Sequence, residues 1–206
     1  MPLRLRHSLP SGTRLNRTST IAVSVGLLLL AAGPLVTPSL GSETSGGPGQ
    51  PYAITPQRRA LLNTIRYAEG TWKQGQAGYR TLYGGGQFNN LERHPERTVV
   101  KRYTSAAAGA YQFLPTTWRE AATKLELESF NPQNQDQAAL YLIDRRGILE
   151  DIDRQGLTRE SMAVLAKEWA SFPNLAGHSA YGQPVKQADS LERFYRSNLQ
   201  RLVARA

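Results

Sequence analysis

Apolar residues recur at three- and four-residue spacing between Thr55 and Gly70, as on one face of an amphipathic helix. These apolar positions are Leu61, Leu62, Ile65 and Ala68. The dipeptide Thr55-Pro56 is typical of a helix start, because threonine can cap the first turn and proline fits the first helical position. Gly70 stands where a left-handed C-terminal cap is expected. The pattern therefore predicts a helix that ends at Glu69.

A different pattern follows between residues 75 and 104, where glycines are interspersed with aromatic and β-branched residues. This composition favours short strands joined by tight turns, so a small, irregular β-region is expected there. The triplet Gly84-Gly85-Gly86 is not followed by Gly-Lys-Ser/Thr or by a helix start. It is interpreted as a turn rather than as a phosphate-binding loop.

Helical spacing returns in the C-terminal half of the chain. Helices are expected from Pro115 to about residue 124, from Pro132 to near Gly147, and over residues 148–154, 158–169 and 190–203. The chain as a whole is predicted to be α+β, mostly helical with one small sheet.

The N-terminal part has the layout of a secretory signal: four arginines without an acid, then an apolar run of 12 residues, then small residues. Such a run is shorter than the ~20 residues that span a bilayer, which disfavours an uncleaved membrane anchor. Small residues suited to cleavage occur at residues 39–41 and at 31–33. We predict a signal peptide at residues 1–41, a flexible linker at 42–52 and one folded domain at 53–206.

The charge of the chain is basic, with a formal net charge of +9. Taking the four arginines of the leader from 25 basic residues leaves 21 against 16 acidic ones, a net charge of +5. A field of this sign suits an anionic partner, but the basic residues are scattered without a nucleic-acid motif, so nucleic acid is not expected. The absence of cysteine excludes disulfides and thiolate chemistry.

Glu69 is the candidate catalytic acid. A carboxyl group at a helix C-terminus faces the negative end of the helix dipole, which favours its protonated form. The alternative is an ordinary surface glutamate in the last turn of a helix. Glycosidases commonly use a second carboxylate, but the neighbouring acids Glu92 and Glu96 stand in a charged run typical of an exposed loop.

Other common chemistries find no support in the sequence. A Gly-x-Ser-x-Gly nucleophile elbow is absent. His94 and His178 stand apart in turn-like segments without metal-ligand spacing, so neither a metal nor a cofactor is expected. Both histidines are expected to face solvent.

A second candidate segment extends from Ser105 to Phe113 and is rich in small residues. A residue such as Gly109 would let a polymer approach the backbone closely, while Tyr111 and Gln112 would supply stacking area and amide hydrogen bonds for sugars. The same spacing also fits small residues that pack two helices together, with Tyr111 in the core. The spacing leaves both interpretations open.

Together these segments resemble the phage lambda endolysin family, glycoside hydrolase family 104. The similarity covers nearly the whole predicted domain in one order, and a dozen motifs in register are far more specific than any one of them. The matching segments are Ala68-Glu69-Gly70-Thr71, Gly78-Tyr79, Gly84-Gly85, His94-Pro95, Gly109-Ala-Tyr111-Gln112, Trp118, Gln135-Asp136, Arg146-Gly147, Trp169-Ala170-Ser171, Pro173, Tyr181-Gly182-Gln183 and Ala188-Asp189-Ser190-Leu191.

The resemblance implies a lysozyme-like catalytic domain whose small β-region flanks the active-site cleft. It also implies a peptidoglycan lytic transglycosylase that acts on the MurNAc-GlcNAc β-1,4 bond with Glu69 as sole acid/base and leaves 1,6-anhydro-muramyl products. One carboxylate suffices because the nucleophile is the C6 hydroxyl of the same sugar, at high effective concentration. The alternatives are a hydrolytic lysozyme with an unrecognised second acid and a catalytically silent peptidoglycan-binding module.

The remaining expectations concern substrate and location. Substrate contacts are expected from Ser105, Gly109, Tyr111 and Gln112, and more weakly from Tyr79, Trp169 and Tyr181. Arg80 departs from the family pattern, which has an acid directly after Gly-Tyr, and this puts substrate placement in question. The protein is expected to be an exported periplasmic or extracellular monomer that binds peptidoglycan glycan strands, needs no cofactor and is not inserted in the membrane after signal cleavage.

Overall fold

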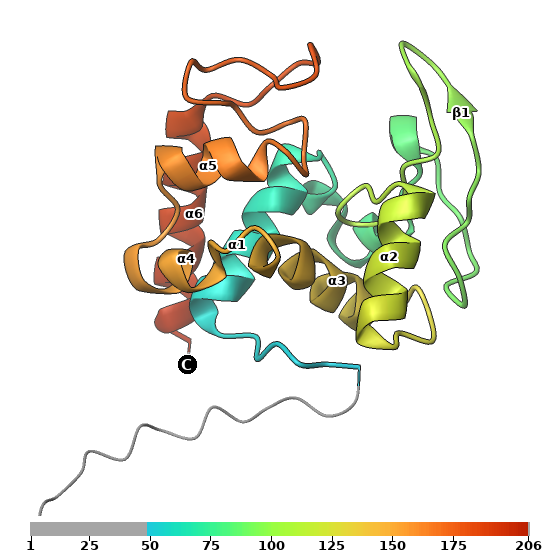
Figure 1. Ribbon diagram of the computed structural model, residues 1–206, viewed down its shortest axis with the longest axis horizontal. Helices are drawn as coiled ribbons and strands as arrows, with labels where there is room; N and C mark the ends of the chain where they lie inside the picture. The colour runs from blue at the N-terminus through green and yellow to red at the C-terminus, as the bar shows by residue number, and fades with distance from the viewer. Residues whose placement is uncertain (1–48, 206) are drawn as a thin grey trace, which may run out of the picture. The chain divides into compact units, whose positions relative to one another are not determined.

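The computed structural model describes residues 49–205, so the predicted signal peptide and most of the predicted linker lie outside the described residues. The α-helices of this part are α1 (Pro56–Ala68), α2 (Pro115–Leu125), α3 (Pro132–Asp144), α4 (Leu149–Gln155), α5 (Arg159–Leu165) and α6 (Ala188–Val203) (Figure 1). Two 3-10 segments, η1 (Trp72–Arg80) and η2 (Tyr83–Gly85), precede the short strands β1 (Val99–Val100) and β2 (Thr104–Ser105). Between residues 49 and 205, no helix is both long and apolar enough to cross a bilayer.

Helix α1 is the central helix, packed against α6, α3, α4 and η1 (Figure 1). The predicted start is confirmed, since the Thr55 side chain accepts a hydrogen bond from Arg58 N–H at 3.2 Å. The apolar face is buried as expected, but so are several polar side chains of the same helix. Two of them are paired with other helices: Asn63 donates to Asn198 at 3.2 Å, and Arg58 pairs with Asp153 at 2.7 Å. Satisfied polar groups allow α1 to be surrounded on more than its apolar face.

The other helices follow the predicted pattern, with one difference at α5. This helix begins after Thr158, which forms a capping box with Ser161, but it ends at Leu165 rather than near Trp169. Beyond Leu165 the backbone continues in turns, with Glu168 N–H donating to the Leu165 carbonyl three residues back. Trp169 is therefore positioned by a turn and not by a helix.

The predicted β-region is small and irregular, as expected: β1 and β2 form a two-residue antiparallel pair, and isolated bridges join Thr81 to Gln87 and Leu82 to Ala108. Turns make up most of the rest of this region. Positive φ angles at Gly75, Gly84 and Gly85 (56°, 78° and 93°) interrupt the extended backbone that longer strands require. The expected turn at the glycine triplet is confirmed.

Candidate active site

A Schellman motif ends α1 at Glu69. The N–H of Thr71 donates to the carbonyl of Arg66 at 2.9 Å, and the N–H of Gly70 donates to that of Tyr67 at 3.3 Å. Gly70 has φ 78°, a left-handed conformation that favours glycine. The sequence prediction of a glycine cap is therefore confirmed, and the cap fixes the backbone of Glu69 in the last turn.

The carboxyl group of Glu69 is desolvated, although part of the residue reaches the surface. Burial raises its pKa from 4.5 to about 7, and a hydrogen bond from Ser171 opposes the rise. Ser171 Oγ donates to Glu69 Oε1 at 2.6 Å. No charged side chain of residues 49–205 is among the causes of the shift. Burial therefore favours the protonated form of this acid, so that a large share of it carries a proton near neutral pH.

Ser171 belongs to the segment that follows α5. Two contacts hold this segment: Trp169 Nε1 donates to the carbonyl of Tyr111 at 3.0 Å, and Lys186 N–H donates to the carbonyl of Ser171 at 2.9 Å. The sequence pattern does not identify Ser171 as a site residue, because 102 positions separate it from Glu69 and no spacing rule joins them. Its only signal is its place in the Trp169-Ala170-Ser171 motif.

The loop from Gly109 to Gln112 packs against the end of α1. Thr71 Oγ1 donates to the carbonyl of Ala110 at 2.6 Å, and the N–H of Ala110 donates to Gln135 Oε1 at 2.8 Å. A Cβ at Gly109, which has φ 81°, would lie 2.3 Å from Gln135 Oε1. The small residue therefore accommodates the protein's own Gln135, and this corrects the expectation that Gly109 admits a sugar.

Tyr79 and Tyr111 lie in the core and not at the surface. Tyr111 is completely buried and Tyr79 is 3% exposed. Both hydroxyls donate to Asp136 Oδ1, and Arg59 pairs with Asp136 Oδ2 at 2.6 Å. Burial raises the pKa of both tyrosines. The structure contradicts the expectation that they contact sugars directly, because their rings and hydroxyls are used inside the fold; the alternative of a core tyrosine is the one observed.

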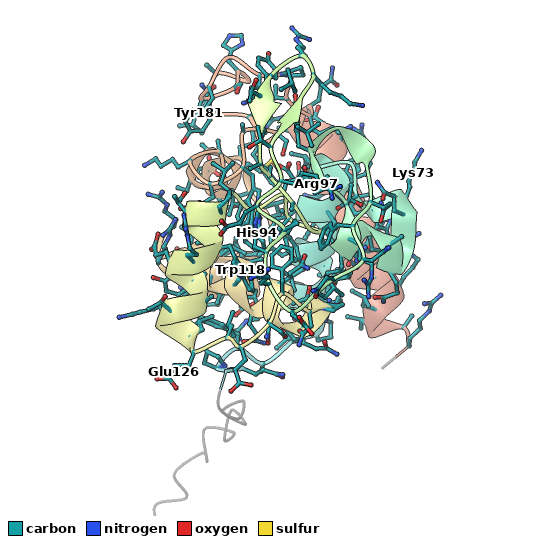
Figure 2. All side chains as sticks on the ribbon, turned by 90° about the vertical axis from the view of Figure 1, so that its right-hand side faces the viewer. Lys73, His94, Arg97, Trp118, Glu126 and Tyr181 are labelled. Atoms are coloured by element: carbon teal, nitrogen blue, oxygen red, sulfur yellow. The ribbon has the colours of Figure 1, made fainter. Side chains whose placement is uncertain are left out.

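The other expected substrate contacts differ in accessibility. Tyr181 is 59% exposed and projects from the surface (Figure 2). Trp169 is buried, which again contradicts a direct sugar contact. Ser105 and Gln112 are half-buried, and the Gln112 amide donates to two backbone carbonyls. Of these four residues, Tyr181 offers the most free surface.

His94 is buried, and the expectation that it faces solvent is wrong. Its ring and that of Trp118, both labelled in Figure 2, each pack against Phe130. Its Nδ1 accepts from Glu96 N–H at 3.1 Å, so Nε2 carries the proton and donates to the carbonyl of Phe113 at 2.9 Å. Burial lowers its pKa, which keeps the ring neutral. His178 is exposed as expected. Among the described residues, no three His, Cys, Asp or Glu side chains are grouped to hold a metal.

Arg80, the position that departs from the family pattern, is half-buried in the β-region. Its Nη1 donates to the carbonyl of Asn89. The guanidinium group is therefore used to hold a neighbouring turn of the same region.

A mostly helical α+β fold with one desolvated glutamate at the end of its central helix defines the lysozyme-like class. A family model described as endolysin matches residues 59–202. The endolysin of Escherichia phage lambda is 36% identical over 144 residues, covering 67% of this chain and 88% of the phage protein. That of Escherichia phage P2 is 34% identical over 93 residues, covering 45% and 53%.

Solved structures agree with this result. Bacteriophage lambda lysozyme complexed with a chitohexasaccharide matches with a TM-score of 0.65 and 33% identity, over 71% of this chain and 96% of that one. Lysozyme from bacteriophage lambda matches with a TM-score of 0.63 and 31% identity, with the same coverage. The chain belongs to the endolysin family, and it is a peptidoglycan-cleaving enzyme with a lysozyme-like fold.

Proposed function

We propose that this protein is a lytic transglycosylase that cleaves the β-1,4 bond between MurNAc and GlcNAc and leaves 1,6-anhydro-muramyl ends. The observation that carries the proposal is the environment of Glu69, whose pKa rises to about 7 through burial, with no charge among the causes. The hydrogen bond that the Glu69 carboxyl accepts comes from the hydroxyl of Ser171 and not from a second acid. A protonated acid held in this way supports a reaction that one carboxyl group carries out.

The proposed reaction uses Glu69 twice. At neutral pH a large share of Glu69 is protonated, because its pKa is near 7. The acid first gives its proton to the glycosidic oxygen as the bond to C1 of MurNAc breaks. The resulting carboxylate then takes the proton of the C6 hydroxyl, whose oxygen closes onto C1. Glu69 gives one proton and takes one back, so it ends in its starting state, and no water is consumed.

Ser171 has a positioning role in this scheme. Its hydroxyl is bonded to Glu69 Oε1 at 2.6 Å, which assigns the other oxygen, Oε2, to the substrate. The bond also favours the carboxylate form, so it limits how far burial raises the pKa. Glu69 thus retains a pKa near the working pH, where a group serves best as both acid and base.

The proposed substrate is the glycan strand of peptidoglycan. The enzyme is proposed to bind it as a monomer and to need no cofactor. Tyr181 is the exposed aromatic side chain proposed to contact sugars. Peptidoglycan lies outside the cytoplasmic membrane, and residues 1–41 are proposed to export the enzyme to it as a cleaved signal peptide. Cleavage would leave the linker and the catalytic domain in the periplasm or outside the cell.

Product analysis tests the proposal. Purified peptidoglycan is digested, and the muropeptide ends are identified by mass spectrometry. We expect 1,6-anhydro ends; reducing ends would overturn the proposal in favour of a hydrolytic lysozyme, and no cleavage would leave a glycan-binding module. Glu69→Gln should lower kcat by about 10²–10⁴, whereas Glu92→Gln, at an exposed position, should retain wild-type activity.

A further inference from the structure

A polar cavity of about 420 Å³ lies between α1, η1 and the beginning of α3, and Glu69 is not among the residues that line it. The polar side chains at its wall include Arg59, Asn63, Arg66, Gln76, Gln133 and Asp136. The proposed reaction uses none of these side chains. The volume suits a small ligand.

Arg66 is the unusual group in this wall, because it is a buried charge without an acidic partner. The residue is 5% exposed, and its guanidinium lies 4.6 Å from the ring centre of Tyr79 and 5.4 Å from that of Trp72. Its Nη2 donates to the carbonyl of Gly75 at 2.5 Å, while its Nε is buried without a partner. Within residues 49–205 no carboxylate forms an ion pair with it. Such a charge is costly unless an anion compensates it.

Asp136, the acid in the same wall, is not free to supply that compensation. Its Oδ2 pairs with Arg59 at 2.6 Å, and its Oδ1 accepts hydrogen bonds from two tyrosine hydroxyls. Two arginines and one aspartate leave the wall with a net charge of +1. Gln133 is the second residue of the 13-residue helix α3, so the positive end of that helix dipole also lies at the cavity.

We propose that this cavity binds one carboxylate group, held by Arg66 and by the side-chain amides of Gln76 and Gln133. Guanidinium binds carboxylates through charge-assisted hydrogen bonds, and a single negative charge matches the net charge of the wall. A dianion such as phosphate fits less well, because its second charge would face Asp136. The carboxylate belongs either to a peptide stem of peptidoglycan or to a free organic acid. The proposal does not depend on the transglycosylase reaction.

The test uses a matched pair of variants at Pro-Gln helix starts. Gln133→Glu places a carboxylate at the cavity from the exposed second residue of α3, and Gln57→Glu places one at the second residue of α1, outside this cavity. Both changes place a negative charge at the second residue of a 13-residue helix, where the helix dipole favours it. Thermal unfolding of the whole protein is followed in sodium acetate against sodium chloride at equal ionic strength.

We expect acetate to raise the Tm of the wild type and of Gln57→Glu. In Gln133→Glu the new carboxylate fills the site, so we expect acetate to bind at least tenfold more weakly. A disaccharide-tetrapeptide product is titrated in parallel with the same disaccharide without peptide. If the disaccharide-tetrapeptide binds more tightly than the disaccharide and this difference is lost in Gln133→Glu, the ligand is a peptide stem of peptidoglycan. If only acetate binds, the ligand is a free organic acid. Equal binding by all three proteins, tighter binding of phosphate than of acetate, or no binding of either probe would overturn the proposal.

Discussion

The hydroxyl of Ser171 donates to the carboxyl of Glu69 at 2.6 Å across 102 residues of sequence. Because this bond stabilises the carboxylate, Ser171→Ala should raise the pKa of Glu69 further. A hydrogen bond to a charged group contributes about 1.5 kcal/mol, or about one pKa unit. The alkaline limb of the kcat/KM profile for peptidoglycan should move up by about that amount. Ser171→Thr, which keeps a hydroxyl, is the control, and an unmoved limb in the alanine variant would refute a positioning role.

Stability should depend on pH through Glu69. Its folded pKa of about 7 exceeds the ordinary 4.5, so between these values the folded state binds more protons and loses stability as the pH rises. Glu69→Gln removes this loss. The free energy of unfolding of Glu69→Gln minus that of the wild type should therefore increase by roughly 3 kcal/mol between pH 4 and pH 9. Urea unfolding of both proteins at several pH values measures this difference. The titration of His94 contributes equally to both proteins and therefore drops out. A constant difference would contradict the raised pKa.

Gly109→Ala should be more destabilising than a change at a glycine of similar φ. A new Cβ at Gly109 would lie 2.3 Å from Gln135 Oε1, whereas Gly147, with φ 72°, has no atom within 4 Å of that position. Gly147→Ala should cost about 1 kcal/mol from its left-handed backbone. Gly109→Ala should cost a further ~1–3 kcal/mol from overpacking. Chemical denaturation gives both values, and equal costs would show that Gln135 moves aside freely.

Tyr111 and Tyr181 should respond differently to truncation. Tyr111→Phe removes a hydrogen bond to Asp136 in the core and should lower stability by about 1.5 kcal/mol with an unchanged KM. Tyr181→Ala removes an exposed ring and should raise KM with little effect on stability. Denaturation together with kinetics on soluble glycan chains separates the two effects. A raised KM in Tyr111→Phe would indicate that this hydroxyl reaches substrate.

Local signals made the helices and their ends predictable. Thr55 and Pro56 act on the first turn of α1 and Gly70 acts on its last turn, so each signal corresponds directly to hydrogen bonds a few residues away. The β-region was less predictable. Its aromatic and β-branched residues favour strands, but positive φ at Gly75 and Gly84 and contacts with distant segments override that preference.

Of the candidate site, the sequence singles out the acid, whose catalytic role stays a prediction. Glu69 is marked by its place at a helix end and by the family resemblance. The burial of Tyr111 depends on Asp136 in another helix, and the bond from Ser171 depends on a turn after α5. Neither contact follows from spacing along the chain, because the fold alone brings these residues together. The same reason explains why His94, with both ring nitrogens bonded, lies in the core.

The cause of the raised Glu69 pKa determines how that pKa responds to ionic strength. An acid whose pKa is raised by nearby negative charges loses part of that shift when ions screen them. Here the shift comes from the removal of water, and mobile ions do not restore the lost hydration. The pH at which this enzyme changes protonation state should therefore stay nearly constant from dilute buffer to high ionic strength, even though the binding of a charged cell wall weakens. The pKa of this acid is set by its burial and by its hydrogen bond from Ser171, and both depend on the fold rather than on the surrounding ions.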